Sequence, residues 1–299
     1  MQKSGIILKG VGSFYYVETD EGVFECRARG IFRKDGKTPL PGDKVLISLH
    51  SDSENTVDTI YPRTNSFTRP PIANLDLLVL VVSVCEPKPN FQVIDKLLAT
   101  AQYKDVETQL VITKADKRNY TDIFDLYKKV GIKTIVASGI TGEGIETLGE
   151  SVKGKVSAFV GNSGVGKSTL INALDESLNL ETARISKKLG RGKHTTRYIE
   201  LFKFGEGFIA DTPGFASIDL VAGEEFLKED LQFCFVEFLP HLGKCKFADC
   251  SHINTSGCEI IEQLKKGNIT ESRYESYLSM YDELKDKYDL NLKENNWQT

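Results

Sequence analysis

The chain has 299 residues, of which 40% are hydrophobic, and its formal net charge at pH 7 is −4. That length predicts about two domains or three small ones, and the charge provides no bulk electrostatic basis for binding nucleic acid. The longest apolar run, Leu77–Val82, is far shorter than the roughly 18 residues of a membrane span, and the N-terminal apolar run is too short for a signal peptide. We therefore expect a soluble, cytoplasmic protein that does not bind membranes.

Residues 1–66 are predicted to form a small β-barrel. Runs of strand-forming residues alternate with turns that contain Gly and Asp: Gly5–Lys9, Ser13–Thr19, Val23–Arg27 and Lys44–Leu49. This spacing is typical of an OB-like barrel of about five strands. Basic residues surround Phe32 in the middle of the segment: Arg27, Arg29, Arg33, Lys34 and Lys37. The group fits an RNA-binding face on which Phe32 stacks, and it fits a solvated charged loop equally well.

Residues 67–219 are predicted to form an α/β domain. After a polar linker at Arg63–Asn74, Leu75–Val84 is a near-continuous apolar run, as expected of a parallel strand buried on both faces. Strands and helices alternate after it: helical spacing over residues 94–101, a strand at Gln109–Thr113, a helix at Ile123–Val130 and a strand at Lys133–Ala137. This alternation predicts a doubly wound sheet that binds ligands at the carboxyl ends of its strands.

Two of these strand ends carry polar motifs. The tetrapeptide Thr113-Lys114-Ala115-Asp116 ends one strand, and Ser138 follows the next. The Asp116 carboxylate can accept hydrogen bonds from N1–H and the 2-amino group of guanine, and the Lys114 stem can lie along the base. Such a tetrapeptide is also an ordinary turn, so its interpretation as a guanine-reading motif depends on a phosphate site elsewhere in the chain.

The segment from Gly161 to Thr169 matches the phosphate-binding pattern G-x-x-x-x-G-K-[ST]. Lys155–Val160 predicts a buried strand before it and Thr169–Leu178 a helix after it. Backbone N–H groups at the helix N-terminus bind phosphate oxygens in such loops, Lys167 would reach the β- and γ-phosphates, and the Ser168 hydroxyl would ligate Mg²⁺. The predicted phosphate-binding residues are Gly161, Asn162, Ser163, Gly164, Val165, Gly166, Lys167, Ser168 and Thr169.

A basic segment without acidic residues, Arg184–Arg197, comes after the phosphate loop. It can clamp the phosphates of a nucleotide or of RNA, and it is also compatible with a disordered surface loop. A β-hairpin is predicted next, at Tyr198–Phe204 and Phe208–Asp211. Asp211 begins the motif Asp-Thr-Pro-Gly; we expect it to hold Mg²⁺ through water, and the Gly214 N–H to meet the γ-phosphate.

Residues 220–299 are predicted to form a mainly helical domain that binds zinc. Helices are expected at Glu224–Leu239, Glu259–Lys266 and Ser272–Leu290, and between the first two lies a cluster of Cys245, Cys250, His252 and Cys258. In a chain without a signal peptide, clustered cysteines indicate a metal before disulfides. Three thiolates and one imidazole complete the tetrahedral set of Zn²⁺ and leave no open position. We therefore expect one structural zinc ion.

The order of these motifs resembles that of the circularly permuted GTPases. In most GTPases the base-reading motif follows the phosphate loop, whereas here Thr113–Asp116 and Ser138 precede Gly161–Thr169. The N-terminal barrel, the C-x4-C-x-H-x5-C spacing and the heptapeptide GRGKHTT at Gly190–Thr196 extend the likeness. Over essentially its whole length, the sequence resembles the ribosome small-subunit-dependent GTPase A family.

The resemblance implies hydrolysis of GTP to GDP and phosphate, stimulated by the 30S ribosomal subunit late in the maturation of that subunit. The barrel and the zinc domain would contact 16S rRNA, and we expect a monomer. Mg²⁺ would accompany GTP, ligated by Ser168, Asp211 and one of Thr195 and Thr196.

Two positions depart from the usual GTPase pattern. Thr113 stands where Asn is common, so its hydroxyl can still tether the loop while an amide donor toward the base is lost. Phe215 stands where many GTPases have a Gln that orients water, which predicts slow intrinsic hydrolysis. His194 is the candidate catalytic residue on the ribosome, and contact with rRNA or packing of its loop is an equally good role for it.

Two other functions are open at this point. A permuted GTPase that acts on the large subunit is disfavoured by the zinc motif and the barrel. A nucleotide-gated RNA-binding module, in which hydrolysis is incidental, is favoured if no ribosomal particle stimulates hydrolysis.

Overall fold

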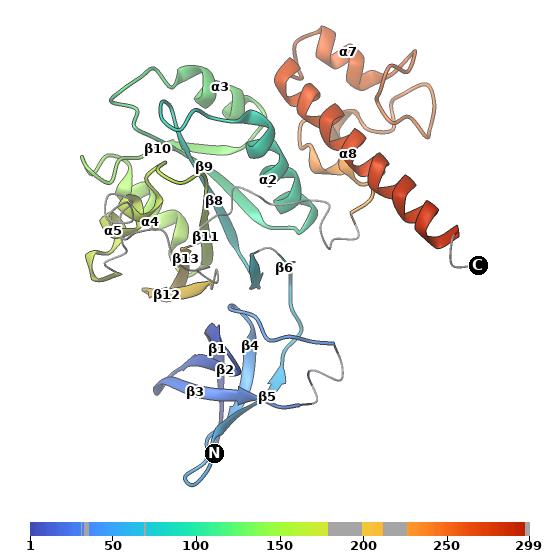
Figure 1. Cartoon of the computed structure of the whole chain (residues 1–299). Helices are drawn as coiled ribbons and strands as arrows, with labels where there is room; N and C mark the ends of the chain where they lie inside the picture. The colour runs from blue at the N-terminus through green and yellow to red at the C-terminus, as the bar shows by residue number, and fades with distance from the viewer. Residues whose placement is uncertain (31, 33–35, 69, 179–198, 212–225, 297–299) are drawn as a thin grey trace, which may run out of the picture.

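The structure is a computed structural model that describes the chain except for residues 31, 33–35, 69, 179–198, 212–225 and 297–299. For Asp211 and residues 286–296 it describes the backbone alone. A β-barrel, an α/β sheet and a helical C-terminal unit follow one another along the chain, and the sheet lies between the other two (Figure 1). Among the described residues, no helix combines the length and the apolar character needed to span a membrane.

The N-terminal barrel is closed by five strands in the order β1-β2-β3-β5-β4. The strands are β1 (Gln2–Val11), β2 (Phe14–Thr19), β3 (Gly22–Ala28), β4 (Lys44–Ser48) and β5 (Asn55–Ile60). Only the β3–β5 pair is parallel. Inward-facing residues of alternating strand positions fill the barrel, including Ile7, Val17, Val45, Ile47 and Val57. The predicted OB-like barrel is confirmed.

The basic group of the barrel differs from the expectation of an RNA-stacking face. Phe32 is 7% exposed and packs in the barrel core, so the interpretation in which it stacks on RNA, one of the two left open by the sequence, is wrong. Arg27 pairs with Glu54 at 3.1 Å, and Arg29 pairs with Asp58 at 2.9 Å. Acidic neighbours therefore neutralise the positive charges of both arginines. Arg33 and Lys34 lie outside the described residues.

The segment predicted as a polar linker is a structured joint. It contains a small hairpin of β6 (Ser66–Thr68) and β7 (Pro71–Ala73), whose Phe67 and Ile72 are buried in the core of the sheet domain. Polar side chains of this segment bond to buried groups: Arg63 Nε lies 2.7 Å from Asp43 Oδ1, and the Asp43 side chain is 0% exposed. The joint therefore attaches the barrel firmly to the sheet.

The central sheet has six strands in the order β10-β9-β8-β11-β13-β12. They are β8 (Leu77–Ser83), β9 (Glu107–Thr113), β10 (Lys133–Val136), β11 (Val156–Val160), β12 (Glu200–Phe204) and β13 (Gly207–Asp211). All are parallel except β12, which forms the predicted hairpin with β13. Every residue of β8 is buried, because helices cover both faces of this strand. The predicted doubly wound sheet is confirmed.

In the part of the chain that the structure describes, two helices pack on each face of this sheet. Helices α2 (Phe91–Tyr103) and α3 (Thr121–Lys129) cover one face, and α4 (Ile145–Val152) and α5 (Lys167–Leu174) cover the other. The sequence did not indicate α4. The predicted helix after the phosphate loop is shorter than expected, because α5 ends at Leu174 and a 3₁₀ turn, η1 (Glu176–Leu178), follows.

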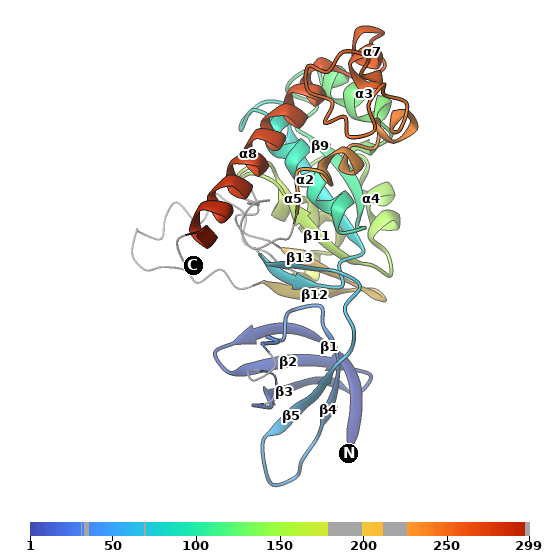
Figure 2. The same cartoon turned by 90° about the vertical axis from the view of Figure 1, so that its right-hand side faces the viewer.

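The barrel covers the edge strand β12, as Figure 2 shows from the side. Lys9 on β1 bonds to Glu200 at 2.7 Å, and Lys203 on β12 bonds to Glu18 of the barrel. An exposed strand edge is a template for pairing with other chains, so the barrel also protects this edge.

The described part of the C-terminal unit, residues 226–296, contains the short 3₁₀ turns η3 (Leu231–Cys234) and η4 (Leu239–His241) and the helices α7 (Glu259–Lys265) and α8 (Glu271–Asn296). The prediction of one helix over Glu224–Leu239 is wrong for its described part. Phe235 and Phe238 are fully buried, with ring centroids 5.4 and 5.0 Å from that of Tyr277 on α8. This aromatic packing overrides the local helix propensity of the segment.

Candidate nucleotide and metal sites

The phosphate loop joins β11 to α5 at the carboxyl edge of the sheet. Three glycines of this loop have positive φ angles: +147° at Gly161, +83° at Gly164 and +106° at Gly166. Residues that carry a Cβ atom rarely adopt such angles. A Cβ atom on Gly161 would lie 2.3 Å from the carbonyl oxygen of Val81. The glycines of the pattern are therefore needed for the loop to turn beside β8 and to present its N–H groups.

Helix α5 begins at Lys167, and the N-terminus of an α-helix that follows such a loop is a typical site for an anion. The Lys167 ammonium group donates to the carbonyl oxygens of Gly161 and Asn162 at 2.7 and 3.1 Å. These contacts hold the positive charge over the loop. Ser168 and Thr169 follow in the first turn of α5, as the pattern requires.

The predicted base-reading motif, Thr113–Asp116, is bonded directly to the phosphate loop. The Thr113 side chain is buried at the end of β9, and its hydroxyl donates to the carbonyl oxygen of Val165 at 2.7 Å. Lys114, with φ +59°, donates from Nζ to the carbonyl oxygens of Gly164, at 2.8 Å, and Glu86. The tether predicted for the Thr113 hydroxyl is present in the structure. Two segments about fifty residues apart thus form one site.

Asp116 and the Ser138 loop complete this edge of the sheet. Asp116 lies exposed in the turn after Lys114. The Ser138 hydroxyl accepts a hydrogen bond from the Thr141 N–H at 3.2 Å, which closes a tight loop after β10. A Cβ atom on Gly139 would lie 2.4 Å from the carbonyl oxygen of Thr169, so this loop packs against the start of α5.

The residues expected to contact the γ-phosphate are described only in part. Asp211 is the last residue of β13, and its backbone is in register with Phe159 of β11, near the start of the phosphate loop. His194, Thr195, Thr196 and Gly214 lie outside the described residues, and so does Phe215.

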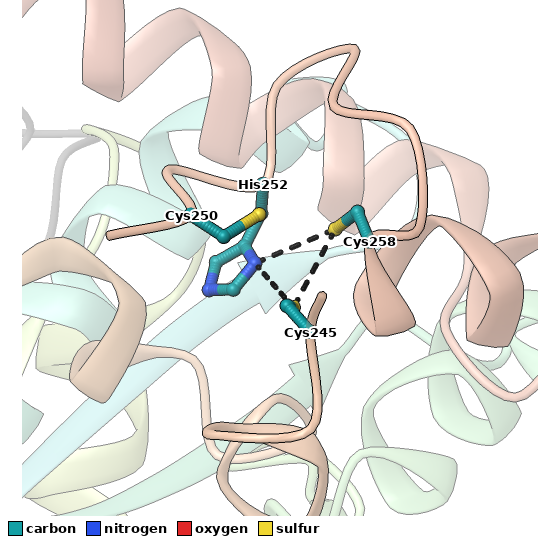
Figure 3. A group of neighbouring side chains, drawn as sticks. All are labelled: Cys245, Cys250, His252 and Cys258. Atoms are coloured by element: carbon teal, nitrogen blue, oxygen red, sulfur yellow. Dashed lines mark hydrogen bonds between the residues drawn. The ribbon is translucent and has the colours of Figure 1, made fainter. Parts of the chain in front are cut away.

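The predicted metal ligands form a compact cluster in the C-terminal unit (Figure 3). The candidate ligand atoms of Cys245, Cys250, His252 and Cys258 all lie within 4.8 Å of one another. The His252 Nδ1 atom lies 3.5 Å from the sulfurs of Cys245 and Cys258, and these sulfurs are 4.0 Å apart. Three sulfurs and one nitrogen around a common centre fit Zn²⁺, with no room for a substrate.

Groups around the cluster fix the orientation of the imidazole. The His252 Nε2 atom lies 3.0 Å from Oε1 of Gln232, so Nδ1 faces the sulfurs. Tyr274 donates from its hydroxyl to the His252 carbonyl oxygen at 2.7 Å, which holds a backbone with φ +61°. Burial lowers the pKa of His252, and this favours the neutral ring that binds metal. The spacing of the cluster predicts the four ligands, but no spacing pattern links Gln232 to them.

Two family models match the chain. The model described as RsgA N-terminal domain matches residues 4–57, and the model described as RsgA GTPase matches residues 60–221.

Curated relatives match over nearly the full length. A protein of Ruminiclostridium cellulolyticum, named small ribosomal subunit biogenesis GTPase RsgA, is 41% identical over 290 residues, which are 94% of each chain. A protein of Bacillus cereus with the same name is 39% identical over 289 residues, covering 95% of this chain and 98% of the relative.

Two solved structures share the fold. YjeQ from Thermotoga maritima is 33% identical with a TM-score of 0.79, and the match covers 95% of this chain and 99% of YjeQ. YloQ, described as a circularly permuted GTPase, is 30% identical with a TM-score of 0.77, and the match covers 96% of each chain.

Proposed function

The chain belongs to the RsgA family of GTPases, and from this membership we propose that it is a late assembly factor of the small ribosomal subunit whose hydrolysis of GTP that subunit stimulates. The observation that carries the proposal is the direct bonding of the base motif to the phosphate loop, through Thr113 and Lys114. It joins a guanine-reading and a phosphate-binding segment although their order in the chain is permuted. The names of the relatives supply the ribosomal partner.

Each part of the site has a proposed role toward GTP. Asp116 reads guanine beside Lys114, Ala115 and the Ser138 loop, and the loop from Gly161 to Thr169 holds the phosphates. Mg²⁺, when bound, neutralises charge that develops on the phosphates during transfer. We propose that it is held by Ser168, Asp211 and either Thr195 or Thr196, and that Gly214 meets the γ-phosphate.

The remaining units are proposed to attach the GTPase to its particle. We assign residues 1–66 to an RNA-binding domain, 67–219 to the GTPase domain and 220–299 to a zinc-binding domain with one structural zinc. The first and last of these would contact 16S rRNA in the 30S particle. We infer a monomer, located in the cytoplasm with the ribosomal particles on which it acts.

Asp116→Asn is expected to weaken GTP binding by about a hundredfold, since charge-assisted hydrogen bonds contribute about 1.5–3 kcal/mol each. The same change should improve binding of xanthosine triphosphate, because the carboxylate acceptor becomes an amide donor. Titration of both nucleotides with the purified chain measures the exchange of specificity. Asp122→Asn, a neighbouring acidic residue on α3, is the control and should change neither affinity. Unchanged GTP affinity in Asp116→Asn would remove this residue from base reading.

GTP turnover should be slow for the free chain and rise at least tenfold with 30S particles, but not with 50S or 70S particles. The reason is Phe215, because its apolar side chain cannot orient the attacking water and another group must do so.

We propose that His194 is the group that orients the attacking water. His194→Ala should then lose the stimulation by 30S particles and keep its affinity for GTP. Phosphate release with each particle is the measurement. Stimulation by 50S would favour a large-subunit factor, and no stimulation would favour an RNA-binding module.

A further inference from the structure

The C-terminal unit is docked on the sheet domain through α2 and α8, which lie side by side in both views (Figures 1 and 2). Among the described side chains, two ion pairs join these helices. Lys96 and Glu283 meet at 2.7 Å with side chains 21% and 39% exposed. Arg273 and Asp95 also meet at 2.7 Å, but their side chains are only 2% and 1% exposed. The pair of Arg273 and Asp95 is thus a buried ion pair between the sheet domain and the C-terminal unit. Binding of GTP does not by itself require such a pair.

The buried guanidinium is bonded on two sides. Arg273 donates from Nη1 to Oδ1 of Asp95, and from Nε and Nη2 to the two carboxylate oxygens of Glu237, at 2.7 and 3.1 Å. Its plane lies over the ring of Phe235, with Cζ 4.5 Å from the ring centroid. Asp95 also accepts a hydrogen bond from the Tyr127 hydroxyl of α3 at 3.0 Å. One side chain of α8 therefore fixes α2, and through Tyr127 α3, against the C-terminal unit.

Helix α2 is also part of the surroundings of the phosphate loop. Val93 and Ile94, which precede Asp95, line a cavity whose wall includes Gly161 and Val165 of that loop. Because Val93 and Ile94 form part of the wall of this cavity, a displacement of α2 at Asp95 changes the shape of the cavity beside the phosphate loop. The residue that bonds to Arg273 and the residues that face the phosphate loop across the cavity are thus neighbours in one turn of α2.

We propose that Arg273 is a positioning residue that couples the C-terminal unit to the phosphate loop through α2. The purpose of this coupling rests on the proposed function: contact of the C-terminal unit with the particle would be passed to the loop that holds GTP. Arginine suits the role because its planar fork bonds carboxylates in fixed directions. Without it, two buried carboxylates face each other with no cation between them.

The first test uses the free chain, with hydrogen exchange measured in Mg·GDP and in Mg·GTPγS. In the unaltered chain, replacing GDP by GTPγS should change the rate of amide hydrogen exchange in the α8 segment around residues 271–285 and in the phosphate loop. Arg273→Met should abolish the change in α8 and keep the change in the loop. Lys96→Met, which breaks the exposed pair between the same helices, should keep both. A nucleotide response of α8 that survives in Arg273→Met, or that is missing from the unaltered chain, would overturn the proposal.

The second test uses 30S particles and separates positioning from simple attachment. Arg273→Met should lower turnover at saturating 30S at least tenfold, with the half-saturating 30S concentration changed less than threefold. Full turnover at saturation with a raised half-saturating concentration would reduce Arg273 to a structural anchor and contradict the proposal. If the unaltered chain is not stimulated at all, the proposed function fails, while the exchange experiment still decides the coupling. Should Arg273→Met not fold, Asp95→Asn removes the charge at nearly constant shape and is expected to give the same two results.

Discussion

Cys258→Ser is expected to empty the zinc site and unfold the C-terminal unit, because metal binding supplies much of the folding free energy of such small units. Structural zinc sites in peptides contribute apparent binding free energies of about 10–16 kcal/mol at neutral pH. Cys258 is 1% exposed, ends the cluster and directly precedes α7, so its loss frees both the metal and the start of that helix. The zinc content measured by metal analysis should fall from about one ion per chain to none. Far-ultraviolet circular dichroism should show the loss of helix.

Cys234→Ser is the matched control for this change. Cys234 is 4% exposed and packs in the same core as Cys258, but its sulfur lies outside the ligand cluster. The variant should keep its zinc and lose only the roughly 1–3 kcal/mol that an imperfectly bonded buried hydroxyl costs. GTP binding should survive in both variants, since the barrel and the sheet have hydrophobic cores of their own. A metal-free chain that keeps α7 and α8 folded would contradict the structural role of zinc.

The features that the sequence predicted well depend on local chemistry. The phosphate loop needs glycines at positive φ within a few residues of one another, so its pattern is complete in one segment. The four residues of the Cys/His cluster likewise fall within fourteen residues, and the burial of β8 follows from its own apolar run. In each case the residues that make the structure are neighbours in the chain, and spacing is sufficient evidence.

The features that the sequence did not predict depend on partners far away in the chain. Arg273 reads as an ordinary charged residue of a helix, and nothing local indicates its bond to Asp95, 178 positions earlier. Phe32 reads as available for stacking until the closed barrel surrounds it. The segment Glu224–Leu239 is predicted to be a helix, but the contacts of Phe235 and Phe238 with Tyr277 decide its path. Long-range contacts decide all three features, and in the segment after Glu224 they also outweigh local helix propensity.

Lys167→Met is expected to lower GTP turnover by about 10²–10³-fold, the range seen when one preorganised donor to developing charge is removed. Lys167 is held over the phosphate loop by the carbonyl oxygens of Gly161 and Asn162, so the charge is in place before the nucleotide binds. Little reorganisation is then needed as negative charge moves between the phosphates during hydrolysis. Methionine keeps most of the length and apolar stem of lysine and removes only the cation. Phosphate release at saturating GTP and 30S measures the loss.

Lys114→Met separates this catalytic charge from support of the loop. Lys114 bonds to Gly164 in the same loop but approaches from the base-reading side of the site. Its loss should weaken GTP affinity about tenfold, as expected for a charge-assisted hydrogen bond, and leave turnover at saturation within about threefold. Equal losses of turnover in the two variants would show that any lysine bonded to the loop acts by stiffening it. If only Lys167→Met loses turnover, the positive charge of Lys167 acts on the phosphate that is transferred. Stiffening of the loop would not explain the difference, because both lysines bond to the backbone of this loop and only Lys167 begins α5.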